Sequence, residues 1–226
     1  KAQQLYGGED YVLQIDSHMR FEKGWDDILI SMLSECDSDK PLLTTYPPAY
    51  EPPMNLKKTS LPKMKPKEFS PQDILLLTSD SIPIEEAPEY PIKGIVCGAC
   101  FIFGRAECME EVPYDPNLYF FGEEISLTVR LWTNGWDFYH PNKLVVYHFW
   151  DRTGRQTHFD DHKDWRMTDK ASKQRVKYML GTTDEKVDIQ HYGLGAVRSL
   201  EDYQKFSGIN FKEKTIGEHY ESSCGV

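Results

Sequence analysis

A strand–helix–strand pattern near the start of the chain does most to restrict the fold it can adopt. The first strand-like run is YVLQI at residues 11–15, and another, PLLTTYP, occupies residues 41–47. The segment between them has apolar residues spaced for one helix face: Trp25, Ile28, Leu29, Met32 and Leu33. Because such a crossover usually joins parallel strands, the pattern predicts parallel pairing and an α/β fold.

The second half of the chain continues this alternation of strands and helices. IKGIVCGACFIFGR, residues 92–105, predicts a strand pair or one long bent strand, and a short helix is expected over 106–112. Apolar periodicity predicts a helix over 123–133, which Asn134-Gly135 would end. A further strand is expected over 143–148.

Proline separates these two halves. Eleven of the 14 prolines lie between Pro41 and Pro91, together with several lysines, so this stretch is unsuited to a long helix or an interior strand. One interpretation is a surface excursion, with DILLLTSDS as a short strand inside it. The other is a loop that shapes an acceptor groove. The chain shows no internal repeat, and we expect one domain over residues 1–226 with residues 41–91 as an excursion within it.

Charge and cysteine content narrow the functional class. The net charge of −10 argues against a general binder of nucleic-acid phosphates. The sequence has no apolar run of about 18 residues, and its first ten residues do not resemble a signal peptide. Five cysteines are an odd number, which fits a reducing, cytoplasmic location. Cys97 and Cys100 form a C-x-x-C inside a strand-like run, so we expect two buried thiols rather than a redox pair.

Acidic and histidine side chains stand where two apolar runs end. Asp16 and His18 follow the run at 11–15, and residues two apart in an extended chain face the same way. His148 closes a second apolar run, KLVVYHFW. Carboxylate and imidazole ligands suit a divalent cation such as Mn²⁺ that also binds phosphate oxygens. The alternatives are an ordinary strand-to-loop exit and, for His148, a packed histidine.

Two adjacent acids open the helix expected over 123–133. Carboxylates at a helix N-terminus stabilise it by about 0.3–1 kcal/mol without any functional role, and this explains one acid well. Glu123 and Glu124 are, however, preceded by Phe120 and Phe121. Aromatic rings stack on sugar faces and acids accept hydrogen bonds from sugar hydroxyls, so the segment also fits a sugar pocket.

Three stretches, in order, resemble the GT-A glycosyltransferases of the polypeptide α-GalNAc-transferase type: IDSHMRF, CGACFIFGRAECMEEVPYDPNLYFFGEEISLTVRLWTNGW and VVYHFW. A closer similarity is to the GlcNAc-transferase family whose known member modifies hydroxyproline on a cytoplasmic ubiquitin-ligase subunit, through LTTYPP and YGLGAVRSLEDYQKFSGINF. The resemblance covers most of the chain, from Leu5 to about Phe211. It implies a GT-A-like, mixed and mainly parallel sheet flanked by helices.

The resemblance also assigns site residues. It implies metal ligation by Asp16, His18 and His148, with Mn²⁺ or another divalent cation as cofactor. It places Glu123 in the donor-sugar pocket, while Glu124 replaces an asparagine of the GalNAc type and leaves the sugar open. The remaining positions that it assigns to substrate binding are Gly98, Ala99, Phe121, Gly122, Arg152, Arg155 and His158. The last three lie in a loop that covers the diphosphate in the related enzymes. The alternative interpretation of these three residues is a solvated charged loop without a role in binding.

Only fifteen residues precede Asp16, so we expect part of the N-terminal nucleotide-binding half of such a fold to be missing. A sheet edge left open in this way favours self-association. The predicted function is a metal-dependent, retaining transfer of a sugar, with GlcNAc favoured, from a UDP-sugar to a protein or peptide hydroxyl (hydroxyproline, Ser or Thr). The alternatives are a non-catalytic transferase-like binding module and a metal-dependent hydrolase.

Overall fold

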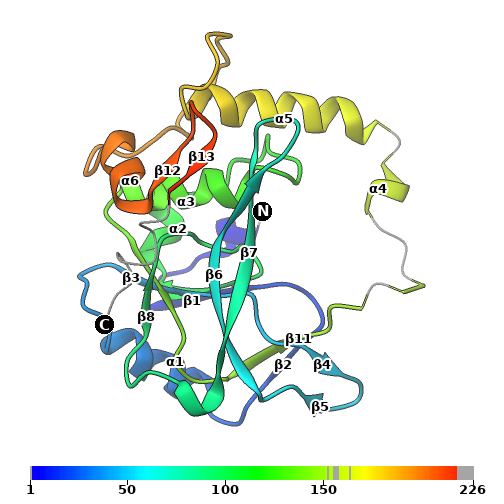
Figure 1. Cartoon of the computed structure of the whole chain (residues 1–226), viewed down its shortest axis with the longest axis vertical. Helices are drawn as coiled ribbons and strands as arrows, with labels where there is room; N and C mark the ends of the chain where they lie inside the picture. Colours follow the sequence, from blue (N-terminus) through cyan, green and yellow to red (C-terminus); the bar gives the residue numbers. More distant parts are fainter. Residues whose placement is uncertain (1, 152, 155–157, 163, 218–226) are drawn as a thin grey trace.

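A five-stranded mixed sheet forms the centre of the molecule. The computed structural model describes residues 2–151, 153–154, 158–162 and 164–217 (Figure 1). In spatial order the strands are β1 (Tyr11–Ile15), β9 (Phe101–Arg105), β3 (Pro41–Thr44), β10 (Asp137–His140) and β8 (Ile92–Gly94). An α/β class is therefore correct.

The expectation of a mainly parallel sheet is wrong. Only β3 and β10 pair in parallel, whereas β1–β9, β3–β9 and β8–β10 are antiparallel. Strands β1 and β3, which precede and follow helix α1 (Trp25–Ser34), do run in the same direction, but β9 lies between them and pairs with both. The crossover pattern thus predicted the relative direction of β1 and β3 and missed the inserted strand.

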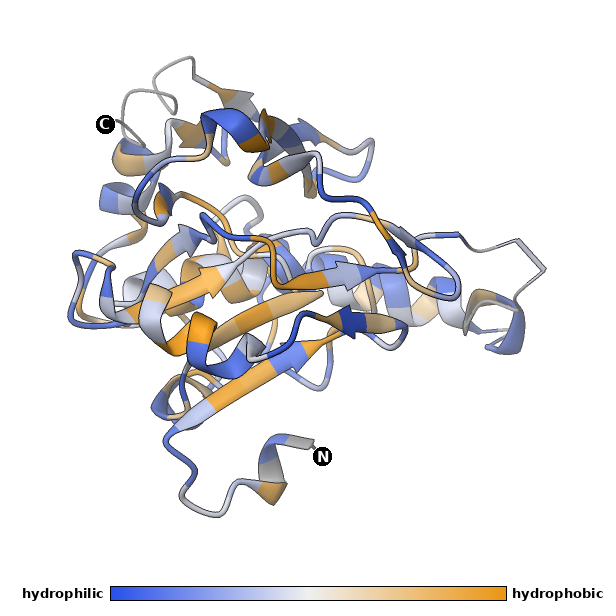
Figure 2. Cartoon of the chain, turned by 90° about the horizontal axis from the view of Figure 1, so that it is seen from below, coloured by the Kyte–Doolittle hydropathy of each residue, from blue (hydrophilic) through white to orange (hydrophobic). Residues whose placement is uncertain are grey.

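Helices cover both faces of this sheet. On one face, Leu29, Met32 and Leu33 of α1 pack with Leu43 and Phe101. The other face is covered by three helices, α3 (Glu123–Thr133), α5 (Trp165–Met179) and α6 (Leu200–Ser207), whose side chains join the larger core cluster. Neighbouring apolar residues of β1, β3, β9 and β10 point into opposite clusters, as the pleat requires, and Figure 2 shows orange, apolar stretches on central strands.

Helix α3 is the most buried of the described helices and has the bounds that its apolar pattern predicts. It is buried throughout from Ile125 to Thr133 because α5 and α6 lie against it. The short helix α2 (Glu107–Glu111) falls within its predicted span, and α1 begins at the predicted Trp25. Helices α1 and α3 were therefore recognisable from the spacing of their apolar residues, whereas the 15-residue α5 was not predicted.

The proline-rich stretch forms a long two-stranded ribbon. Strands β6 (Ser60–Phe69) and β7 (Leu75–Pro83) pair antiparallel and run along much of the molecule (Figure 1). The strand expected in DILLLTSDS is found as β7, whereas β6 was not predicted. Its prolines are tolerated because a two-stranded ribbon has free outer edges, and the pairing register shifts just after Pro66. A smaller hairpin of β4 (Tyr50–Glu51) and β5 (Asn55–Leu56) precedes it.

Residues 92–105 do not form a continuous strand. The chain leaves the sheet after Gly94 and re-enters at Phe101, and residues 95–100 form a loop between them. Threonine side chains accept hydrogen bonds from two backbone amides of this loop. The Cys97 amide donates to Thr128 Oγ1 (2.9 Å) and the Gly98 amide donates to Thr44 Oγ1 (2.9 Å). Cys97 and Cys100 are buried free thiols, as predicted, and burial raises both pKa values.

Small elements complete the chain. They are η1 (Ala2–Leu5), β2 (Met19–Phe21), η2 (Ile84–Glu86), β11 (Val146–His148), α4 (His158–Asp161), β12 (Ile209–Asn210) and β13 (Thr215–Ile216). β11 occupies the end of the strand predicted over 143–148 and pairs with β2. Within the described ranges, none of the helices has the length and apolar character needed to span a bilayer.

Candidate active site

Two strand ends meet at one edge of the molecule. Asp16 comes directly after β1, and its amide donates to the Cys100 carbonyl (3.2 Å). β2 then turns back to pair with β11, which places His148 opposite Met19. The backbone of His148 is also fixed by a hydrogen bond from its amide to the Pro48 carbonyl (2.9 Å). The local pairing therefore brings the residue after β1 next to the last residue of β11.

The side chains of Asp16 and His148 face each other. Oδ2 of Asp16 lies 3.5 Å from Nε2 of His148, with the imidazole buried and the carboxylate about half exposed. His18 is exposed and has a left-handed backbone (φ 66°). Across the residues that the structure describes, no three His, Cys, Asp or Glu side chains form a group able to hold a metal. The structure thus brings two of the three predicted ligands together and leaves His18 apart.

The chemistry of this pair fits a divalent cation. A carboxylate oxygen and an imidazole nitrogen are donors that Mn²⁺ accepts, and two protein donors leave positions for substrate oxygens. The His148 ring is held by Trp150, whose ring centroid lies 4.2 Å away. Trp150 is itself fixed, because its Nε1–H donates to the Pro47 carbonyl (2.9 Å).

The predicted acid pair opens α3, and its second member is tightly held. Gly122 adopts a left-handed conformation (φ 98°) at the N-cap, and a Cβ there would lie 3.0 Å from Val176 Cγ2. Glu124 accepts hydrogen bonds on both oxygens, from the Tyr46 hydroxyl (2.7 Å) and the Ala99 amide (3.1 Å). Glu124 therefore joins the helix start to the end of β3 and to the loop at 95–100.

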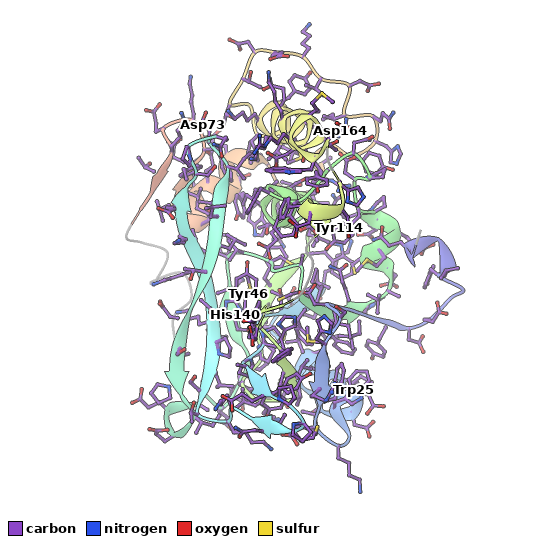
Figure 3. The ribbon with its side chains drawn as sticks, turned by 90° about the vertical axis from the view of Figure 1, so that its right-hand side faces the viewer. Trp25, Tyr46, Asp73, Tyr114, His140 and Asp164 are labelled. Carbon is purple, nitrogen blue, oxygen red and sulfur yellow. The ribbon has the colours of Figure 1, made fainter. Side chains whose placement is uncertain are left out.

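Glu123 has a different partner. The Tyr114 hydroxyl hydrogen-bonds to its carboxyl group. Tyr114 in turn accepts a hydrogen bond from Nε2 of Gln14, and the same nitrogen donates to the Ala99 carbonyl (2.7 Å). Figure 3 shows Tyr46 and Tyr114 in the middle of the molecule rather than on its outline. Two tyrosines and one glutamine thus surround the acid pair.

The electrostatics of this cluster extend to the Asp16–His148 pair. Burial raises the pKa of Glu123 to about 7, and the charges of Glu124 and Asp16 add to the shift, against the Tyr114 hydrogen bond. Burial also raises the pKa of Glu124, and Asp16 contributes there too, while hydrogen bonds from Tyr46 and Ala99 oppose the shift. Asp16 bonds to Cys100 and Glu124 bonds to the preceding residue, Ala99, so the strand-end pair and the acid pair adjoin the same short loop.

Gly98 and Ala99 have clear structural roles in this site. A Cβ at Gly98 would lie 2.6 Å from Met64 Cε and 2.9 Å from Tyr46 Cε1. A glycine there is what allows Tyr46 to lie against the loop and reach Glu124. Ala99 contributes its amide to Glu124 and its carbonyl to Gln14.

Aromatic side chains border the acid pair. Phe120 and Phe121 are each about 40% exposed, and their ring centroids are 5.0 Å apart. The Lys173 ammonium lies 5.4 Å from the Phe121 ring centroid. His158 begins α4, whereas Arg152 and Arg155 lie outside the described residues.

Three residues of the site were not predicted from the sequence: Gln14, Tyr46 and Tyr114. Gln14 carried a usable signal, because it lies two positions before Asp16 in the same extended segment and shares its side of the chain. Tyr46 also carried a signal, because it lies just after the carboxyl end of β3, and ligands of open α/β sheets bind at such strand ends. Nothing local marked Tyr114, which reaches the site through the loop after α2.

One protein family matches most of the chain. A family model described as glycosyltransferase (GlcNAc) matches residues 1–213. Among curated proteins, no significant match to the chain is found.

Proposed function

The chain belongs to the glycosyltransferase (GlcNAc) family and is a glycosyltransferase, and we propose that it transfers N-acetylglucosamine from UDP-GlcNAc to a protein hydroxyl in a metal-dependent, retaining reaction of GT-A type. The observation that carries the proposal is the common site formed by Asp16, His148 and the two acids of α3. A donor diphosphate at the strand ends and its sugar at the acids would occupy adjacent parts of this site.

The strand-end residues form the diphosphate end in this proposal. Asp16 and His148 would hold Mn²⁺ or another divalent cation, with exposed His18 as the third ligand. When bound, such an ion neutralises charge on the departing nucleoside diphosphate. The buried imidazole and its contact with Trp150 limit the ring's motion, which keeps its nitrogen directed at Asp16.

The acids form the sugar end. Glu124 is anchored by Tyr46 and Ala99, so its main contribution is to hold the loop at 95–100 against α3. Glu123 has a single tyrosine partner and retains oxygen lone pairs for sugar hydroxyls. Retention of configuration does not require a protein base on the acceptor, so Glu123 acts as a pocket residue rather than a nucleophile.

The acceptor is proposed to be a protein or peptide hydroxyl, of hydroxyproline or of Ser/Thr. Exposed Phe120 and Phe121 beside the acids supply an apolar surface of the kind that peptides cover. The cysteines that the structure describes are free thiols, which supports a reducing, cytoplasmic setting for this acceptor.

A donor and acceptor panel tests the proposal. The protein is incubated with Mn²⁺, one of UDP-GlcNAc, UDP-GalNAc and UDP-glucose, and peptides that differ only in hydroxyproline, proline, serine or threonine. We expect UDP release that depends on both UDP-GlcNAc and a hydroxylated peptide, with addition of one N-acetylhexosamine to that peptide by mass spectrometry. Free sugar released at full rate without acceptor would instead identify a hydrolase. Absence of any calorimetric signal with UDP and Mn²⁺ would identify a non-catalytic module.

A further inference from the structure

Gln14 joins two parts of the site that are separate along the chain. Its Nε2 group donates to the Tyr114 hydroxyl and, at 2.7 Å, to the Ala99 carbonyl. Gln14 lies in β1, Ala99 in the loop before β9 and Tyr114 in the loop after α2. One side-chain amide therefore uses both of its N–H groups to fix neighbours of the acid pair.

The direction of these bonds fixes the Tyr114 proton. Because the Gln14 N–H group occupies a lone pair of the phenolic oxygen, the Tyr114 hydroxyl hydrogen is free to point at Glu123. A hydrogen bond donated to a carboxyl group favours its ionised form. Tyr114 thus opposes the effect of burial and of the neighbouring acids on Glu123.

The two acids are held in unequal surroundings. Glu124 accepts hydrogen bonds from two donors, Tyr46 and the Ala99 amide, whereas among the described side chains Tyr114 is the donor to Glu123. The titratable groups that face Glu123 are Glu124 on the same helix, Tyr114 from the loop after α2 and Asp16 from the end of β1. Removal of the Tyr114 hydroxyl therefore removes the hydrogen bond that opposes the effect of these two acids on Glu123.

We propose that Tyr114 and Gln14 are positioning residues of the transferase, which orient the Glu123 carboxyl group toward the donor sugar and favour its charged form. The proposal rests on the proposed function, because it assigns the sugar end of the donor to Glu123. It adds a specific division of roles: Tyr46 and Ala99 anchor Glu124, and the Gln14–Tyr114 pair sets the state of Glu123.

Tyr114→Phe is the sharpest test, since it removes one oxygen atom and little volume. We expect kcat for transfer from UDP-GlcNAc to fall roughly threefold to tenfold, the loss for one hydrogen bond. Affinity for UDP alone should not change, because UDP lacks the sugar. The acidic limb of the pH–rate profile should move to higher pH, because Glu123 has lost the donor that favours its charged form. Gln14→Met should cause the same changes to a smaller degree.

Tyr139→Phe is the matched control. This substitution also removes a hydroxyl that donates a hydrogen bond, here to the Asp37 carbonyl (2.8 Å). Tyr139, however, lies on the α1 side of the sheet. We expect a wild-type pH–rate profile for this variant. A shift in Tyr139→Phe equal to that in Tyr114→Phe would overturn the proposal, because the effect would then be structural.

An NMR titration of Glu123 tests the role of Tyr114 and Gln14 without relying on transfer activity. The carboxyl carbons of Glu123 and Glu124 are followed by NMR in protein labelled with ¹³C at the glutamate carboxyl, assigned through Glu123→Gln. We expect the Glu123 midpoint to rise in Tyr114→Phe and in Gln14→Met and to stay unchanged in Tyr139→Phe. An unchanged midpoint in both site variants overturns the proposal even if the protein is an active transferase. A wild-type protein without transfer activity refutes the proposed function and leaves this titration readable.

Discussion

Nε2 of His148 lies 3.5 Å from Oδ2 of Asp16, although His148 ends a strand of one sheet and Asp16 follows a strand of another. β1 belongs to the central sheet and β11 pairs only with β2 among the described strands. The contact therefore depends on the short turn between β1 and β2, which carries both Asp16 and His18. The same turn sets the distance from the strand ends to the acids of α3.

Single substitutions test the proposed ion site. Asp16→Ala and His148→Ala should each weaken Mn²⁺ binding at least tenfold by isothermal titration, since each removes one of two facing donors. His148→Ala should also lower the free energy of unfolding by about 1–3 kcal/mol because the imidazole is buried. His18→Ala should weaken Mn²⁺ binding with little change in stability, because His18 is exposed.

His191→Ala is the control for these variants, since His191 is exposed and lies elsewhere in the chain. Its Mn²⁺ affinity should equal that of the parent. A His148→Ala protein that binds Mn²⁺ as the parent does would show that the ion is not held at the strand ends.

Glu123→Gln tests the sugar end of the site. The substitution should reduce transfer at least tenfold and leave the affinity for UDP nearly unchanged, because UDP has no sugar hydroxyl for the carboxylate to accept from. Calorimetry with UDP and a transfer assay with UDP-GlcNAc measure the two effects. Glu110→Gln, at an exposed acid of α2, should change neither. Equal losses of UDP affinity and of transfer in Glu123→Gln would place Glu123 outside the sugar pocket.

The raised pKa of Glu123 predicts a pH dependence of stability. Between the usual pKa of glutamate and about 7, the folded protein binds more protons at this group than the unfolded chain does. The free energy of unfolding should therefore fall as pH rises through this window, by about 1–3 kcal/mol from this one group. Urea unfolding at pH 5 and pH 8 measures the difference, and Glu123→Gln should reduce it. A difference unaffected by Glu123→Gln would mean that Glu123 ionises as readily in the folded protein as in the unfolded chain.

Gly98→Ala tests whether close packing positions Tyr46. The added methyl group would meet Met64 and Tyr46 at less than 3.0 Å, so one of them has to shift. We expect a loss of stability of about 1–3 kcal/mol and a loss of transfer activity as the Tyr46–Glu124 bond is disturbed. Gly193→Ala is the control, because its methyl group would meet only Ile189 at an ordinary 3.6 Å. Full activity of Gly98→Ala would separate Tyr46 from the reaction.

The edge strand β1 predicts self-association. Among the described strands β1 pairs with β9 alone, and Tyr11 and Ile15 on it are each nearly 40% exposed. An open, apolar edge recruits further strands. Light scattering should show association that rises with protein concentration and that Tyr11→Lys with Ile15→Lys reduces. A monodisperse monomer at all concentrations would contradict this prediction.

Helices α1 and α3 were predictable because their signal is local. The spacing of Ile125, Leu127, Val129 and Leu131 reports burial of α3, and the predicted bounds match the structure. Strand order was not predictable in the same way, since the pairing of β9 between β1 and β3 joins residues far apart in sequence. The run at 95–100 had strand-like composition, but its amides found threonine hydroxyls instead of a neighbouring strand.

The site, too, contains residues that the local sequence indicates and residues that only the fold brings in. The acids, the aspartate and the histidines were recognisable as residue types at element ends. Tyr46 and Tyr114 became visible only when the fold placed them against Glu124 and Glu123. A tyrosine in a loop has no distinctive pattern, and its role depends on which distant group its hydroxyl reaches.

The contact between Asp16 and His148 also links the stability of the folded protein to the concentration of the ion. An ion bound by both would act as a reversible cross-link between segments that are distant along the chain, and its binding free energy would add to that of folding. By mass action, free ion at about 100 times its dissociation constant adds about 2.7 kcal/mol. Chelation would then lower the amount of folded protein as well as its turnover, and the two losses would follow the same ion titration.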